Sequence, residues 1–118
     1  MLAILIIFKT ITEALSRARD VAKALSDTSR LRILAALAER ELCVCHFTSF
    51  LDVDASNVSR HVSILRRAGL ITVRKKGRWL HCARAEATPE IWTLVDTLLA
   101  GAPETERDAE ILAREASC

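Results

Sequence analysis

Two cysteines separated by a single residue carry the clearest chemical potential in this chain. They are Cys43 and Cys45, and the sequence holds two more cysteines, Cys82 and Cys118. Thiolates are soft ligands that suit Cu(I), zinc and cadmium. The C-x-C spacing differs from the C-x-x-C of disulfide exchangers, and no βαβ pattern surrounds it. The pair therefore predicts a ligand site and not an enzyme.

A second kind of chemistry lies in the distribution of charge. Eight basic residues and no acid occur between Ala55 and Ala85. The other segments carry nine basic and fifteen acidic residues, so the net charge of +2 conceals a basic segment on an acidic chain. Such a segment is an electrostatic footprint for a polyanion, although a basic run can also be no more than a solvated surface.

Within the basic segment, residues 55–68 are predicted to form a helix that is capped by Asp54 and ends at Gly69. Its apolar residues share one side, and the opposite side is small, hydroxylic and basic. Residues 71–74 and 79–82 alternate at period two, which predicts a β-hairpin with a basic tip. A helix of this kind fits the major groove of DNA, and a basic hairpin can lie against phosphates. The predicted DNA-binding residues are Ser56, Asn57, Ser59, Arg60, His61, Ser63, Arg67, Lys75, Lys76 and Arg78. His61 lies at the edge of the core side of the helix, so it could pack instead.

The elements that must position these residues are mainly helical. Apolar residues at alternating spacings of four and three predict a long helix over residues 2–25 with a seam suited to a partner helix. Packing of that seam inside its own domain is the alternative. Short helices follow, one after Ser26-Asp27 and one over residues 41–51. A helix begins at the Thr88 cap with Pro89 in its first turn, and an acidic helix covers residues 104–116.

These elements define a fold class: mainly α with a small β-hairpin, a winged helix-turn-helix. We expect one domain over residues 1–118, with residues 41–85 as helix-turn-helix plus wing and residues 1–25 and 88–118 as dimerisation helices. The few Gly and Pro residues, five in all, exclude a turn-rich β-sandwich or a low-complexity chain. The apolar start is too short to span a bilayer and lacks the features of a signal peptide, so we expect a cytoplasmic protein without a membrane partner.

Three stretches also resemble the ArsR family of metalloid-responsive repressors. They are Glu41-Leu42-Cys43-Val44-Cys45, Ser59-Arg60-His61-Val62 and the run from Lys75 to His81, and Leu25-Ser26-Asp27-Thr28-Ser29-Arg30-Leu31 matches the opening of the family's second helix. The resemblance covers about residues 20 to 85. It implies a homodimeric repressor that binds double-stranded operator DNA and releases it when arsenite or antimonite bonds to its thiols, with no organic cofactor.

One departure from the family pattern concerns the third thiol. Where arsenic-sensing members have Cys-Val-Cys-Asp-Leu-Cys, this chain has Cys43-Val44-Cys45-His46-Phe47-Thr48, and Thr48 is not a soft ligand. We expect Cys43, Cys45 and Cys118 as ligands. Cys82 is expected to be structural, a small thiol from solution is a further source, and His46 and His81 are expected to be hydrogen-bonded structural residues. Zinc or cadmium sensing, thiol-redox sensing and metal-independent DNA binding remain alternatives.

The spacing of the two cysteines suggests a switch. On an ideal helix, residues i and i+2 lie roughly 200° apart, so both sulfurs cannot reach one ion. Because Cys43 and Cys45 are both expected at the start of the helix over residues 41–51, binding must unwind or bend the start of that helix. Because it supports the DNA-reading helix, the strain would misalign the two readers of a dimer.

Overall fold

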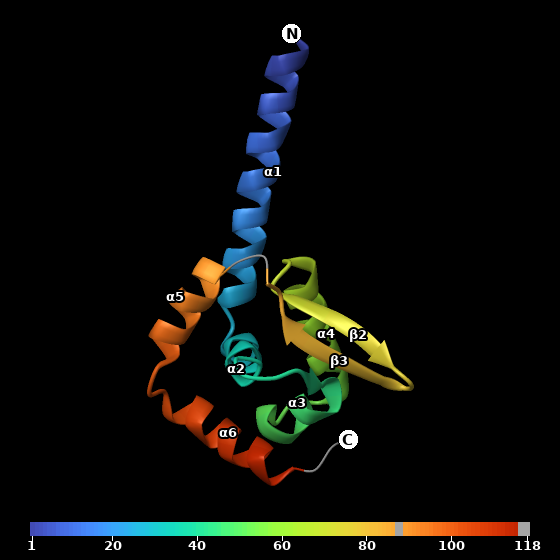
Figure 1. Ribbon diagram of the computed structural model, residues 1–118, viewed down its shortest axis with the longest axis vertical. Coiled ribbons are helices and arrows are strands. Elements are labelled where there is room, and N and C mark those ends of the chain that lie inside the picture. Colours follow the sequence, from blue (N-terminus) through green and yellow to red (C-terminus); the bar gives the residue numbers. More distant parts are fainter. Residues whose placement is uncertain (87–88, 116–118) are drawn as a thin grey trace.

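The computed structural model describes residues 1–86 and 89–115. Its long first helix projects from a body made of short helices and one hairpin (Figure 1). The elements are α1 (Leu2–Leu25), α2 (Thr28–Ala36), β1 (Leu42–Cys43), α3 (Val44–Leu51), α4 (Ala55–Arg67), β2 (Ile71–Lys76), β3 (Trp79–Arg84), α5 (Pro89–Leu99) and α6 (Pro103–Arg114).

Helices α2, α3 and α4 enclose the hydrophobic core. Their largest fully buried side chains include Ile33, Phe47 and Leu65. Two aspartates begin helices as the sequence predicts: Asp27 Oδ1 accepts from the Arg30 amide at 3.1 Å, and Asp54 Oδ1 accepts from the Asn57 amide at 2.9 Å. Helix α4 ends within one residue of its predicted boundary, and the core fixes which of its faces is exposed.

The hairpin is the wing of the predicted winged helix-turn-helix. Strand β2 pairs antiparallel with β3, and the sheet has the order β1-β3-β2. The strands are longer than predicted, because Lys75 and Lys76 pair with Leu80 and Trp79 inside the ladder. The turn is only Gly77-Arg78, and the φ of +61° at Gly77 is the left-handed conformation that favours glycine.

The start of the third helix differs from the prediction. Residues 41–51 were expected to be helical throughout, but Leu42 and Cys43 form strand β1, which pairs with Cys82 and His81 of β3. Cys43 has extended backbone angles, φ −71° and ψ 145°, and precedes the first helical residue of α3. Pairing with a strand nearly forty residues away, which local periodicity does not reveal, holds these two residues out of the helix.

Helix α6 folds back onto the helix-turn-helix. It packs against α2 and α3 and places Asp108, which is 3% exposed, beside Arg32 of α2. The guanidinium donates to both carboxylate oxygens at 2.8 Å. Helix α5 begins at Pro89 as predicted, whereas the Thr88 cap lies outside the described residues. The predicted last helix reached residue 116, but α6 ends at Arg114.

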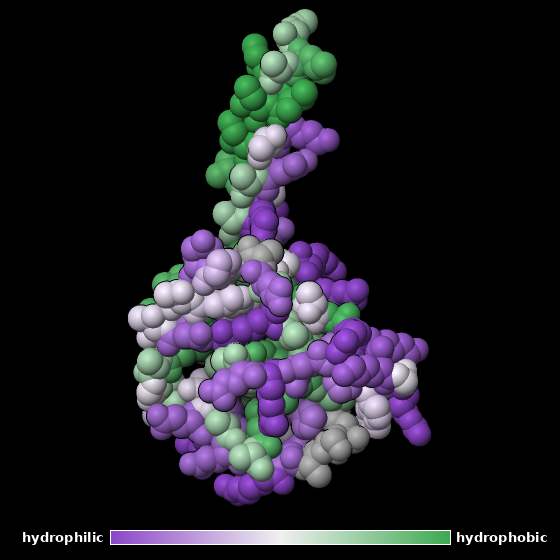
Figure 2. Space-filling model, in the orientation of Figure 1, coloured by the Kyte–Doolittle hydropathy of each residue, from purple (hydrophilic) through white to green (hydrophobic). Residues whose placement is uncertain are grey.

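The outer part of α1 is apolar and exposed. Figure 2 shows hydrophobic side chains along the projecting helix, in contrast to the largely hydrophilic face of the body below it. The exposed members include Ile4, Phe8, Ile11 and Leu15, and Leu94 and Leu98 of α5 are exposed as well. Within the described residues, no helix combines the length and apolar character needed to cross a membrane.

Candidate thiol site and nucleic-acid interface

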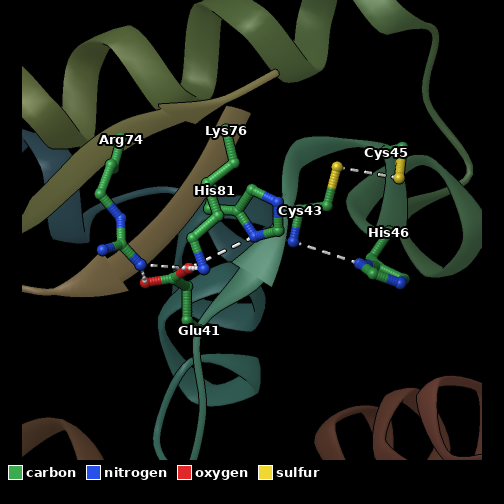
Figure 3. A network of polar contacts seen from close by, with 7 residues as sticks. All are labelled: Glu41, Cys43, Cys45, His46, Arg74, Lys76 and His81. Carbon is green, nitrogen blue, oxygen red and sulfur yellow. Dashed lines mark hydrogen bonds and ion pairs between the residues drawn. The ribbon is translucent and has the colours of Figure 1, made fainter. Parts of the chain in front are cut away.

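The sulfur atoms of Cys43 and Cys45 lie 3.0 Å apart (Figure 3). Cys43 is a free cysteine, 3% exposed, at the junction of β1 and α3, and Cys45 is half-buried in the first turn of α3. The extended backbone at Cys43 allows this approach, since only Cys45 belongs to the helix. The expectation that both cysteines lie on a helix with diverging sulfurs is therefore wrong, and no unwinding is needed to bring them together.

His46 supports the backbone at this junction. Its Nδ1 accepts a hydrogen bond from the Cys43 amide at 3.2 Å. That bond satisfies an amide at the start of α3 that has no acceptor within the helix. His46 is thus hydrogen-bonded, as expected, and the bond fixes the backbone from which the Cys43 sulfur extends.

Glu41 links this junction to the wing (Figure 3). Its carboxylate accepts from Arg74 Nη2 at 3.1 and 3.0 Å, and it lies 3.4 Å from Lys76 Nζ and 3.3 Å from His81 Nδ1. The hydrogen bond from Arg74 holds the pKa of the Glu41 carboxyl below its usual range, and Lys76 adds to this effect. Sequence reasoning missed this contact, because the acid lies outside the segment that carries the basic run.

Cys82 differs from Cys43 and Cys45 in its environment. It is fully buried in β3, opposite Leu42 and Val73. Burial raises the pKa of its thiol to about 11, and the nearby Cys43 and Glu41 add to the rise. Because the thiolate is the ligand form of cysteine, a thiol that stays protonated in the core is a poor ligand.

A third ligand for the pair is not found in the described part of the chain. Across residues 1–86 and 89–115, no three His, Cys, Asp or Glu side chains gather so that they could hold a metal ion. Cys118, the predicted third ligand, lies outside the described residues. Among the described residues, the structure therefore brings together two soft sulfur atoms at this junction and no third donor beside them.

The predicted DNA-reading face of α4 is exposed. Ser56, Ser59 and Ser63 share its outward side, and Asn57, Arg60 and Arg67 are exposed as well. His61 differs: it is half-buried, with Nδ1 3.2 Å from Arg30 Nη1 and 4.0 Å from Asp27 Oδ1. The structure thus places His61 against α2, which is the packing role that the sequence left open.

The wing presents two kinds of cation. Arg74 and Lys76 are engaged by Glu41, as described above. Lys75 and Arg78 are exposed, and no carboxylate of the described residues lies within 4.0 Å of either. The Arg78 guanidinium lies 5.9 Å from the ring centroid of Trp79. The unpaired cations near the turn are the wing residues best placed to meet a phosphate backbone.

The fold and this distribution of charge define a DNA-binding protein of the winged helix-turn-helix class. Residues 27–73 match the family model described as bacterial regulatory protein, arsR family. An arsenic resistance transcriptional regulator of Pseudomonas putida is 36% identical over 89 residues, 75% of this chain and 67% of the relative. The chain belongs to the arsR family.

Other relatives show how broad the family is. The arsenical resistance operon repressor of Escherichia coli is 45% identical over 60 residues, 50% of this chain and 51% of the relative. A cadmium resistance transcriptional regulatory protein of Listeria innocua is 37% identical over 60 residues, 50% of each chain. These relatives are transcriptional regulators and not enzymes, and this chain is a regulator of the same family, whose members are named for different ions.

A solved structure supports the fold. The homodimeric winged helix-turn-helix DNA-binding domain of Mycobacterium bovis is 26% identical, with a TM-score of 0.67 over 74% of this chain and 82% of the other. The prediction of a mainly helical winged helix-turn-helix is confirmed.

Proposed function

We propose that this repressor releases its DNA when arsenite or antimonite bonds to the thiols of Cys43 and Cys45. The observation that carries the proposal is the 3.0 Å separation of the two sulfurs. Each thiol that bonds to arsenite replaces one hydroxyl group, which leaves as water with the thiol proton. The Pseudomonas putida and Escherichia coli relatives, both named for arsenic resistance, support this choice of ion.

Cys118 is our proposed third ligand. Helix α6 packs against α3, the helix that begins at the thiol pair, and ends at Arg114. Four residues can span at most about 14 Å of extended chain. The docking of α6 on α3 therefore favours a ligand that follows α6. Cys82 is a poorer candidate for the third ligand, because its thiol is fully buried in β3 and stays protonated there.

The route from the thiols to the DNA-binding elements runs in two directions from Cys43. This residue precedes α3, which packs against α4, and it pairs with His81 of the wing strand β3. A shift of the Cys43 backbone would move both the start of α3 and the edge of the wing. Such a local change can bias the equilibrium between DNA-binding and released states.

We further propose that the repressor acts as a homodimer through α1 and α5. The apolar side chains along α1, together with Leu94 and Leu98, are more than half exposed in the single chain, and clustered exposed apolar side chains mark an interaction surface. Two copies would bring two α4 helices to half-sites about one helical turn apart, roughly 34–36 Å. In this arrangement Ser56, Asn57, Ser59 and Ser63 face bases, while Lys75 and Arg78 face phosphates.

A fluorescence-anisotropy titration tests the thiol proposal. Duplexes bound by the wild-type protein are first selected from a random library, and arsenite is then titrated into the complex. A phosphine reductant keeps the cysteines reduced without adding a thiol. We expect wild type to release the duplex, and Cys43→Ser and Cys45→Ser to bind it normally without release, because a hydroxyl does not replace a thiolate for a soft ion.

Cys82→Ser is the matched control, because it also removes one sulfur but lies outside the pair. Release of the Cys43→Ser complex at the wild-type arsenite concentration would refute the site. Complete loss of response in Cys82→Ser would show that the third ligand is misplaced.

Cadmium is the second candidate, on the strength of the Listeria innocua relative. The same titration with cadmium chloride compares the two ions. Zinc is less well supported, since structural zinc takes four ligands and the described residues bring together only the two sulfurs.

A further inference from the structure

A hollow of about 360 Å³ lies where α1, α2 and α4 meet. Basic side chains dominate its lining: Lys23 of α1, Arg30 of α2, and Arg60 and Arg67 of α4. Asp20 also lines it and is ion-paired with Arg19 at 3.5 Å. The hollow therefore carries an excess of positive charge next to the DNA-reading helix.

Three of these cations have no acidic partner among the residues that the structure describes. Lys23, Arg60 and Arg67 are exposed, and no described carboxylate lies within 4.0 Å of them. Like charges around one hollow repel one another, so an anion placed there would relieve the repulsion. The hollow is therefore electrostatically suited to an anion.

Arg30, the fourth basic residue of the hollow, is hydrogen-bonded to backbone carbonyls at the end of α1. Its Nε donates to the Ala24 carbonyl at 2.8 Å and its Nη2 to the Lys23 carbonyl at 3.0 Å. Carbonyls at the end of a helix carry partial negative charge, which would repel an anion. Arg30 covers those of α1 and so makes the end of that helix compatible with a bound anion.

The place of the hollow on the flank of α4 indicates which anion it would hold. Arg60, Ile64 and Arg67 follow one another at helical spacing along one stripe of α4, and Ile64 packs against the core. This stripe is the flank of the helix that faces α1, beside the outward face of Ser56, Ser59 and Ser63. When a helix lies in the major groove, its flanks face the sugar-phosphate strands and its outward face meets the bases.

We propose that this hollow holds a phosphodiester of the DNA backbone, with Lys23, Arg60 and Arg67 as its cationic contacts. The inference rests on the proposed placement of α4 in the major groove. It adds Lys23 of α1 to the DNA interface and assigns Arg60 and Arg67, which the sequence predicts to bind DNA, to the backbone and not to the bases. Phosphate contacts set the register of a protein on the duplex without reading its sequence.

Salt-dependent binding to two duplexes tests the proposal, one selected by the wild-type protein and one of random sequence. We expect Lys23→Ala and Arg60→Ala to weaken binding to both duplexes by the same factor, roughly two- to fivefold. The slope of log K against log salt should fall by about 0.9 per protomer. Lys9→Ala is the matched control, because Lys9 is an exposed lysine of the same helix outside the hollow.

A methylphosphonate scan locates the contact. Neutralising one backbone phosphate per half-site should weaken wild type, and the same change should weaken Lys23→Ala by a smaller factor, because only Arg60 and Arg67 then remain to contact that phosphate. Lys23→Ala with wild-type affinity and slope would overturn the proposal, as would an Arg60→Ala variant that changes the preference between the duplexes. Selective loss of DNA binding when phosphate replaces chloride at constant ionic strength would assign the hollow to a free anion instead.

The outcomes separate this inference from the thiol proposal. Lys23→Ala should still release its duplex with arsenite, because the hollow is not part of the thiol site. If wild type binds neither duplex, both proposals fail. If wild type binds and responds to arsenite while Lys23→Ala equals it, only the phosphate contact fails.

Discussion

Arg32 and Asp108 form a two-pronged ion pair that fastens the last helix to the helix-turn-helix. Both carboxylate oxygens accept from the guanidinium at 2.8 Å, and the same guanidinium donates to the Phe50 carbonyl near the end of α3. The Arg32 side chain thus joins α2, α3 and α6. Because a pair of this kind is desolvated on the Asp108 side, removing one partner leaves a costly charge.

Asp108→Ala should lower the free energy of unfolding by about 2–3 kcal/mol, which is less than for a fully buried pair because Arg32 keeps some contact with water. Urea denaturation at fixed protein concentration measures this change. Glu110→Ala is the control, since Glu110 is exposed on the same helix. Equal stability of the two variants would show that the pair does not fasten α6.

The same helix bears on the response to arsenite. Asp108→Asn should loosen α6 without altering α4, so DNA affinity should stay near that of wild type while release requires more arsenite. Cys118→Ser should weaken release, and a small thiol added to the titration should restore release in part, because it can fill one coordination position. Arsenic-edge X-ray absorption counts the sulfur ligands: we expect three in wild type and two in Cys118→Ser without added thiol. Three sulfurs in Cys118→Ser would refute Cys118 as the third ligand.

Sequence patterning was sufficient for most of the fold because its helices carry local signals. Asp27 and Asp54 mark helix starts through their own side chains, and alternation at period two marks the wing. Strand β1 carries no such signal. Two apolar residues fit either a helix or a strand, and the choice is made by pairing with β3. That choice decides whether the Cys43 and Cys45 sulfurs meet.

The ion pairs of the basic segment could not be predicted from the sequence. It showed eight basic residues without an acid between Ala55 and Ala85, but Glu41 and Asp96 come from outside that segment to pair with Arg74 and Arg84. Long-range ion pairs depend on the fold and not on sequence spacing. The structure therefore divides the basic run into cations that hold the wing in place and cations that remain available for DNA.

The Cys82 thiol should be inert in the folded protein. Its pKa of about 11 leaves little thiolate at pH 8, and its side chain is fully buried. Iodoacetamide at pH 8 should label Cys82 only after unfolding in urea, as read by mass spectrometry of the digested protein. Rapid labelling under native conditions would contradict this and would reopen Cys82 as a ligand.

Glu41→Gln should strengthen binding to DNA of any sequence. The carboxylate neutralises Arg74 and Lys76, so its removal frees two cations on the wing. The slope of log K against log salt should steepen by about 0.9 for each freed cation that reaches a phosphate. Glu39→Gln serves as the control, since Glu39 is exposed in the loop before β1. Weaker binding would mean that Glu41 contributes to DNA affinity by ordering the wing.

The apolar surface of α1 and α5 should hold two copies together. Phe8 is 71% exposed and Leu98 72% exposed in a single chain. Burying a large apolar side chain stabilises the dimer by about 1.5–3 kcal/mol. In a two-fold interface each residue contributes once from each protomer, so a substitution acts twice. Phe8→Glu and Leu98→Glu should therefore weaken dimerisation at least roughly a hundredfold, as measured by sedimentation equilibrium.

DNA affinity should fall together with dimerisation, because a monomer offers one α4 helix to a two-part site. Lys9→Gln, a polar change one residue from Phe8, should leave both unchanged. A monomeric mass for wild type at micromolar concentration, with tight binding to a selected duplex, would show that the exposed surface of α1 serves another partner.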